Sequence, residues 1–275
     1  PKLLLLTLAF AVTTGSAMSP IGNPQNLLIA INGSLTNPFL VFFQYLFIPT
    51  VANLVLAYLL LRLFYKSQFQ QTAIEIPKEC ISDPTLANIS RISIILLLIL
   101  ILAKVLAVTV QSSQHFSLTY IAIFSALPVI LFSSRRWEIM KHIDWCTLVF
   151  FAAMFVLMDS VWRSGFFQSM MEESSLGFGS IPVILALSVF LSQIISNVPF
   201  VALFQPLLIN PSAQDLMALA AGSTIAGNLF ILGAASNVII IQNAEKSGET
   251  LTFLDFARVG VPLTALNVFV YWIFL

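Results

Sequence analysis

The stretches GSAMSPIGNPQNLLIA (residues 15–30) and GNLFILGAASNVIIIQ (residues 227–242) decide the fold of this chain. Each is a polar, glycine-containing segment inside a long apolar run. Asn26 and Asn237 lie 211 positions apart, and a pair of glycines has the same separation. Two apolar runs that are interrupted in the same way predict two related helices, each broken near its middle.

Composition identifies the solvent of the protein. Hydrophobic residues make up 59% of the 275 residues and charged residues only 9%, whereas soluble domains carry about 25% charged residues. The two cysteines, Cys80 and Cys146, have no paired spacing, which excludes a disulfide framework and a zinc site as explanations. We therefore expect an all-α integral membrane protein with the lipid bilayer as its main partner and no nucleic acid partner.

The apolar runs predict a polytopic membrane protein, because a span needs about 20 mostly apolar residues. The stretch 176–209 is also apolar, but it breaks at Ser196-Asn197-Val198-Pro199. A polar loop is expected at 66–91 and a short basic loop at 133–143. The predicted spans are 2–31 (interrupted), 38–65, 92–112, 116–133, 144–162, 213–243 (interrupted) and 252–275.

Basic residues orient these spans, since lysine and arginine in short loops favour the cytoplasmic side. Placing 66–91 in the cytoplasm leaves Arg163 as the basic residue on the opposite side. This count requires 176–209 to be a re-entrant hairpin that enters and leaves on the outer side; a single span there would place the loop after residue 243 outside. The cytoplasmic basic residues are then Lys2, Arg62, Lys66, Lys78, Arg91, Arg135, Arg136, Lys141, Lys246 and Arg258.

Broken helices at membrane depth predict a binding site. Unsatisfied backbone amides are costly in hydrocarbon, so such breaks persist only where protein or a polar cavity surrounds them. One such segment alone would be explained by the close helix packing that small residues permit. Two at the same spacing, running in opposite directions, instead predict an inverted repeat with a transport site near the bilayer midplane.

The predicted organisation is a single transport unit in a multi-pass protein of the plasma or inner membrane. Residues 1–65 are the second part of a first repeat, with its broken helix and the helix that follows. Residues 66–143 are a cytoplasmic loop and two linking helices. Residues 144–275 are the second repeat, with a helix, the hairpin 176–209, the broken helix 213–243 and a last helix.

Four segments together resemble the ion transporter superfamily in their order and spacing. This superfamily includes arsenite-pump permeases, sodium/proton antiporters of the NhaD type, the melanosomal P protein, divalent anion/sodium symporters and citrate-transporter-like domains. The similarity covers nearly the whole chain apart from 66–135. The segments are IDWCTLVFFAAMFVLMDSVWRSGFF (143–167), LSQIISNVPFVALFQPLL (191–208), GNLFILGAASNVIIIQNAEKSGETLTFLDFARVGVPLT (227–264) and SPIGNPQNLLIA (19–30).

The resemblance implies which residues bind substrate and ions, and the breaks themselves add Ser19, Gly227 and Asn228. The family's first hairpin would precede Pro1, so we expect half of the binding site to lie outside this chain. Several relatives carry aspartate where Ser196 stands, which weakens the case for proton antiport. The residues implied by the resemblance are Gly22, Asn23, Pro24 and Asn26 on the first broken helix, Ser196, Asn197 and Pro199 at the hairpin tip, and Gly233, Ser236 and Asn237 on the second broken helix.

These features predict a secondary active transporter that moves a small anion or oxyanion, such as arsenite or a carboxylate, by alternating access. Carbonyl and amide oxygens near Asn23, Asn26 and Asn237 suit sodium as the coupling ion, and we expect no other cofactor. A sodium/proton antiporter of the same superfamily is the alternative, and an ion channel is a more remote one. An enzyme is not expected, because HExxH, GxSxG and paired aspartates are absent from the sequence.

Two charged residues inside predicted spans need separate explanations, because intramembrane charges are usually functional or paired. Asp159 is a candidate for ion coupling, although Arg163 lies four residues away on the same helix, where the two side chains can pair. Lys104 belongs to the linking helices, which in the family often form a scaffold or a dimer contact. A homodimer is therefore an expectation of the resemblance.

Overall fold

A computed structural model places residues 2–70, 81, 83–110, 117–172, 179–246 and 248–275. Lys78 and Cys80 lie outside these described residues. The regular structure in the described part is helical throughout, which agrees with the predicted all-α fold. The chain divides into two units, one formed by residues 1–71 and 152–275 and the other by residues 72–151.

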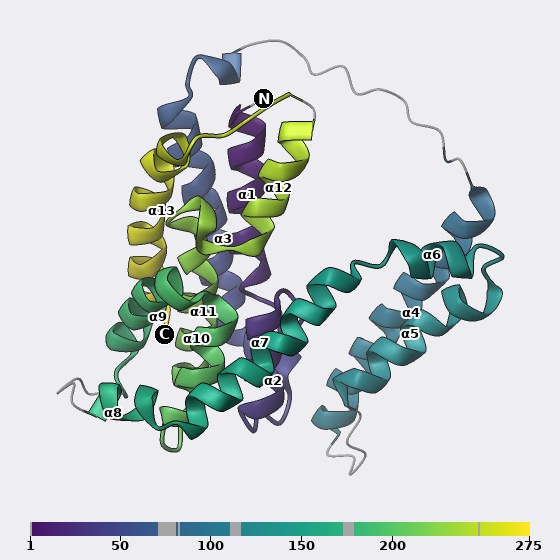
Figure 1. Ribbon diagram of the computed structural model, residues 1–275, viewed down its shortest axis with the longest axis horizontal. Coiled ribbons are helices and arrows are strands. Elements are labelled where there is room, and N and C mark those ends of the chain that lie inside the picture. Colours follow the sequence, from purple (N-terminus) through teal and green to yellow (C-terminus); the bar gives the residue numbers. More distant parts are fainter. Residues whose placement is uncertain (1, 71–80, 82, 111–116, 173–178, 247) are drawn as a thin grey trace. The chain divides into compact units, whose positions relative to one another are not determined.

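The first unit carries both broken helices and the hairpin (Figure 1). Short 3₁₀ turns, Gln205–Leu207 (η2), Ala226–Asn228 (η3) and Ile231–Gly233 (η4), lie at the points where α-helices stop. Its α-helices are α1 (Lys2–Ser16), α2 (Pro24–Asn32), α3 (Pro38–Phe64), α8 (Phe166–Glu172), α9 (Ile181–Ile195), α10 (Asn197–Phe204), α11 (Ala213–Ile225), α12 (Ala235–Lys246) and α13 (Phe253–Phe274).

The second unit contains α4 (Pro84–Thr109), α5 (Leu118–Phe132) and α6 (Arg136–His142), and α7 (Trp145–Arg163) begins in it and ends in the first unit. The prediction of a polar loop over 66–91 is wrong at its end. Asp83 accepts a hydrogen bond from the backbone N–H of Leu86, and Pro84 follows it, so an N-cap starts α4 before the apolar pattern begins. The predicted basic loop at 133–143 contains α6.

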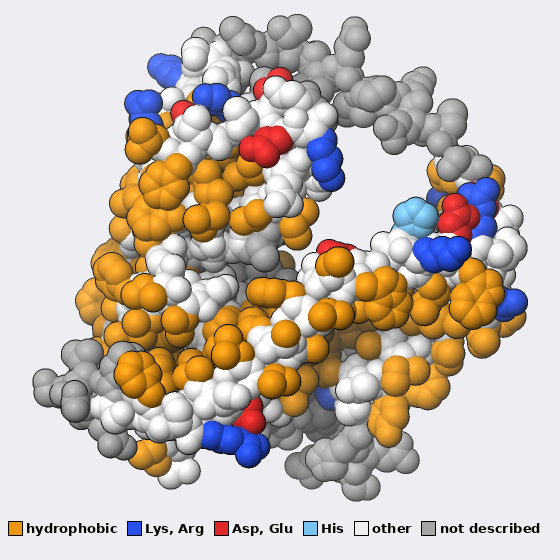
Figure 2. Space-filling view, in the orientation of Figure 1, with side chains coloured by type: hydrophobic (Ala, Val, Ile, Leu, Met, Phe, Trp, Pro, Cys, Tyr) orange, Lys and Arg blue, Asp and Glu red, His pale blue; other side chains and the backbone are white. Residues whose placement is uncertain are grey.

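Four described helices are long and apolar enough to cross a membrane: α3, α4 up to Ala107, α7 and α13. Many of their large apolar side chains are exposed; Phe269, Trp272 and Ile273 of α13, for example, are all more than half exposed. Figure 2 shows hydrophobic side chains along the flank of the first unit and charged ones near the end that carries the N-terminus. Such a surface requires a hydrocarbon solvent.

The other membrane helices of the first unit are too short to cross alone. α1 and α9 have 15 residues each, about 22 Å of helix, against a hydrocarbon core of about 30 Å. α9 runs parallel to α11, because Leu185 and Ser188 face Gly222 while Gln193 donates to the carbonyl of Ala226. The chain breaks at Ser196 between α9 and α10, at the predicted tip, and whether this hairpin is re-entrant in the membrane stays a prediction.

The two broken helices run in opposite directions (Figure 1). At one end of the unit, Lys2 of α1 pairs with Asp255 of α13 at 2.6 Å. At the other end, Asn32 of α2 lies beside Gln205 of the hairpin. α3 and α13 hold the pair together, with a buried hydrogen bond of 2.7 Å between Thr50 and Tyr271.

Candidate functional site

The first break lies between α1 and α2, and its chain path requires glycine. A Cβ at Gly22 would collide with the backbone carbonyl of Ser16. Asn23 then caps α2: its side-chain oxygen accepts from the N–H of Asn26 at 2.8 Å, and Pro24 occupies the first helical position. The predicted residues Gly22, Asn23 and Pro24 therefore turn the chain and restart the helix.

Asn26 satisfies the carbonyls that the break releases. Its Nδ2 donates to the carbonyl oxygens of Ser16, Ala17 and Ser19 at 3.2, 3.3 and 3.1 Å. The side chain is fully buried. The last carbonyls of a helix lack partners within the helix, so this single amide replaces the water that hydrocarbon cannot supply.

The second break repeats this arrangement between α11 and α12. Asn237 Nδ2 donates to the carbonyl of Gly227 at 2.7 Å, ten residues earlier in the chain, as Asn26 does to Ser16. A Cβ at Gly233 would lie 2.8 Å from the carbonyl oxygen of Ala226, so glycine is required here too. The spacing of 211 residues therefore marks two equivalent breaks.

Hydrogen bonds join the two breaks directly. Asn23 Nδ2 donates to Thr224 Oγ1 at 3.0 Å, and Thr224 Oγ1 donates to Asn26 Oδ1 at 3.3 Å. Asn228 Nδ2 donates to Thr14 Oγ1 at 3.0 Å. The fold thus brings together segments about 200 residues apart in the sequence and makes one buried polar layer from them.

The hairpin tip is strained. Ser196 has φ 70° and ψ 160°, a region that is essentially restricted to glycine and costs about 1–3 kcal/mol for other residues. Its side chain is exposed, whereas Asn197 and Pro199 beside it are buried. Asn197 Oδ1 has no hydrogen-bond partner among the described residues.

Five buried oxygen atoms without partners lie near the second break and the hairpin, and five others lie elsewhere in the described chain, on α3, α4, α8 and α13. In native folds nearly all such atoms are paired, so each one calls for an explanation. Amide oxygens bind hard cations such as sodium, and the unwound ends of broken helices add carbonyls to such sites. The five oxygens near the second break and the hairpin, unpartnered in the described part of the chain, are Asn197 Oδ1, Asn228 Oδ1, Asn237 Oδ1, Thr13 Oγ1 and Ser192 Oγ.

Two predicted residues stand apart from this layer. Ser236 is half-buried in the first turn of α12. Asp159 forms an ion pair of 2.8 Å with Arg163, and its side chain is 58% exposed. The neighbouring Met158 packs instead against the cluster of Phe167 and Leu203 beside the hairpin.

Sequence reasoning missed three residues that complete the layer. Thr13 and Thr224 also lie 211 positions apart, so the repeat spacing could have identified them. Gln193 was hidden inside an apolar helix, and its amide donates to the carbonyl of Ala226 at 2.8 Å. The described residues hold no group of three or more acidic, histidine or cysteine side chains that could bind a metal ion.

The family model described as citrate transporter matches residues 1–216 of the chain. The chain belongs to the citrate transporter family. Together with the four long apolar helices, this makes it a multi-pass membrane protein, as the sequence predicted.

Similar proteins include the P protein of Mus musculus, which is 31% identical over 174 residues, or 56% of this chain and 21% of that protein. A 46 kDa membrane protein of Mycobacterium leprae (strain TN) is 25% identical over 98% of this chain and 66% of its own length. An uncharacterized transporter of Mycobacterium bovis is 28% identical over 96% of this chain and 64% of its own length. The chain therefore spans about a fifth of the P protein and just under two thirds of these mycobacterial relatives.

Proposed function

We propose that the protein is a secondary active carrier that moves a small anion or oxyanion across the membrane by alternating access, driven by sodium. The observation that carries this proposal is the pair of antiparallel broken helices, linked by Asn23, Thr224 and Asn26. Broken helices with opposite directions are the elements that such carriers use to bind ions at the midplane.

Sodium fits the chemistry of the second break better than a proton does. The three segments that form the layer, residues 15–30, 191–209 and 222–242, contain no aspartate, glutamate or histidine. A proton-driven carrier generally needs an ionisable group inside the membrane. Among the residues proposed earlier for sodium, Asn237 has an unpartnered oxygen, whereas Asn23 and Asn26 use their oxygens to close the first break.

The layer also limits the substrate. Its three segments carry no lysine or arginine, so an anion would be bound by amide N–H groups and by the positive ends of half-helices. The description of the family names citrate, which makes citrate the first carboxylate to test. Arsenite, a neutral hydroxide at neutral pH, is the second, because it needs donors but no cationic partner.

Flux measurements in proteoliposomes test the coupling. We expect uptake of radiolabelled citrate or arsenite when an inward sodium gradient is imposed at equal pH, and none when only a pH gradient is imposed. Saturable uptake with counterflow distinguishes a carrier from a channel. Full flux on a pH gradient without sodium, abolished by Asp159→Asn, would contradict sodium coupling and assign the proton to Asp159.

Asn197→Ala tests the hairpin tip. We expect it to abolish uptake while the yield of inserted protein stays near that of the wild type, because the Asn197 oxygen has no hydrogen-bond partner to lose among the described residues. Asn243→Ala is the matched control, since Asn243 is an exposed asparagine on α12. Lost yield with unchanged transport per molecule would show that Asn197 is a packing residue.

A further inference from the structure

We propose a second binding site, for small carboxylates, in a pocket between the end of α2 and the arm of the hairpin that leads away from its tip. The pocket has a volume of about 610 Å³, within the range of small-molecule sites. It lies along the far end of α10, where Ala202 of that helix lines it, about six residues or roughly 9 Å of helix from Ser196 at the tip. Its lining residues are Asn32, Gly33, Ser34, Ala202, Gln205, Pro206, Leu208, Asn210 and Pro211.

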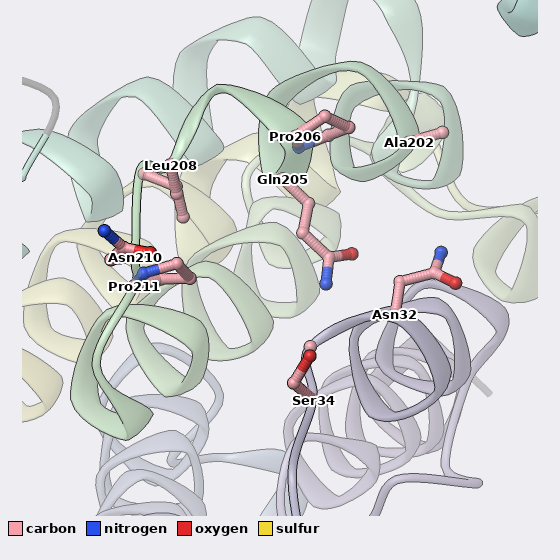
Figure 3. A pocket seen from close by; sticks show the side chains of 9 residues that line it. Asn32, Ser34, Ala202, Gln205, Pro206, Leu208, Asn210 and Pro211 are labelled. Atoms are coloured by element: carbon pink, nitrogen blue, oxygen red, sulfur yellow. The ribbon is translucent and has the colours of Figure 1, made fainter.

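Gln205 is the residue that points to a ligand. Its side chain projects between the wall that carries Asn32 and Ser34 and the wall that carries Asn210 and Pro211 (Figure 3). The residue is only 8% exposed, and its Nε2 has no hydrogen-bond partner among the described residues. A buried donor without a partner destabilises the fold. A bound acceptor oxygen would replace the hydrogen bond to water that the amide loses on folding.

The backbone turns sharply on both sides of the pocket. Ser34 and Asn210, one from each wall, have φ values of 52° and 49°. Asparagine adopts this left-handed region readily, whereas it is uncommon for serine. These turns place the two side chains at the rim of the pocket, and the case for a ligand rests on Gln205.

The lining is compatible with a ligand that carries acceptor oxygens. None of the nine lining residues is charged, so no acidic side chain in the pocket wall repels an anion. The amides of Asn32 and Asn210 and the hydroxyl of Ser34 can donate beside Gln205. The choice of a carboxylate rests on the proposed function, while the pocket and its unpaired donor do not.

Protection from thiol labelling tests this site. Ser34→Cys is introduced together with Cys80→Ser and Cys146→Ser, and the purified full-length protein reacts with an uncharged thiol reagent. Sodium citrate, on the order of 10 mM as suits a weak site, is compared with sodium chloride at equal sodium concentration, with choline chloride added to equalise the ionic strength. We expect citrate to slow labelling several-fold, because a bound ligand covers position 34.

Gln205→Met in the same background should remove this protection, because methionine keeps the side-chain length but has no N–H donor. Gln214→Met is the matched control, since Gln214 is exposed on α11 and does not line the pocket. We expect protection to persist in it. Thermal unfolding without citrate separates binding from folding: Gln205→Met should be at least as stable as its parent, since it removes an unpaired buried donor.

Asn197→Ala separates the two sites. If citrate still protects position 34 in this variant, the pocket at Gln205 binds citrate independently of the hairpin tip. This result would stand even if the protein transports no carboxylate. Equal labelling rates in citrate and in chloride would contradict the proposed binding site at Gln205. Protection that disappears in Asn197→Ala but survives Gln205→Met would also overturn it, because the ligand would then be at the tip.

Discussion

The two broken helices carry the same sequence motif but leave different atoms unsatisfied. In the first break, Asn26 donates to three carbonyls and its own oxygen accepts from Thr224. In the second, Asn237 donates to one carbonyl, and its oxygen has no partner among the described residues. A motif repeated at one spacing therefore pairs its amide oxygen in one place and leaves it without a partner among the described residues in the other.

The threonines of the two breaks show the same asymmetry. Thr224 links to Asn26, and the equivalent pair at the spacing of 211 residues is Thr13 with Asn237. Thr13 Oγ1 and Asn237 Oδ1 both lack partners in the described structure. If the second break binds sodium, Thr13 Oγ1 and Asn237 Oδ1 are the two ligand atoms that the repeat places there.

Asn26→Ala should have the largest effect of these substitutions, a loss of stability. It removes two N–H donors that are shared among three carbonyls and the oxygen that accepts from Thr224, at roughly 1 kcal/mol for each donor or acceptor, so we expect a loss of about 3 kcal/mol and a sharply lower yield of monodisperse protein. The thermal midpoint in detergent measures it. If the variant has normal stability but its uptake no longer depends on sodium, the first break rather than the second would be the ion site.

Asn237→Ala should act mainly on the ion. Because its oxygen is unpartnered while its N–H bonds a single carbonyl, we expect the sodium concentration for half-maximal uptake to rise about tenfold, equivalent to about 1.4 kcal/mol. A sodium titration of uptake in proteoliposomes measures this shift. An unchanged sodium dependence in a correctly folded variant would remove Asn237 from the ion site.

The threonine pair provides a matched comparison. Thr224→Val breaks bonds to both Asn23 and Asn26 and should destabilise the protein by about 1–2 kcal/mol. Thr13→Val removes no protein hydrogen bond seen for its hydroxyl in the described chain and should change stability by less than about 0.5 kcal/mol. Unfolding in sodium-free choline buffer measures both, and equal losses would show that the two breaks are closed alike.

Ser196→Gly should have a small and opposite effect, a gain in stability of about 1 kcal/mol, because glycine adopts φ 70° without strain. Ser196→Val is the matched control and should lower stability, since a branched Cβ is disfavoured there. Both are measured by thermal unfolding. If glycine instead lowers stability, the serine side chain itself stabilises the tip.

The sequence by itself determined the solvent, the helical class and the positions of the breaks. Low charge and long apolar runs require lipid whatever the detailed packing, and glycines at one spacing predict the two interruptions. The hairpin followed from the distribution of charge, and residues 191–208 resembled its tip. The solvent, the helical class and the breaks could be predicted because they depend on the composition of short segments, whereas the re-entrance of the hairpin stays a prediction.

Only the tertiary structure decided which atoms remain free. Thr224 reaches Asn26 across 198 positions of sequence, so no local pattern could show that the first break is closed and the second open. The same holds for the unpaired amide of Gln205, which depends on Ser34 and Gly33 lying opposite it. Hydrogen bonds require contact within about 3 Å, and folding alone determines which distant residues come that close.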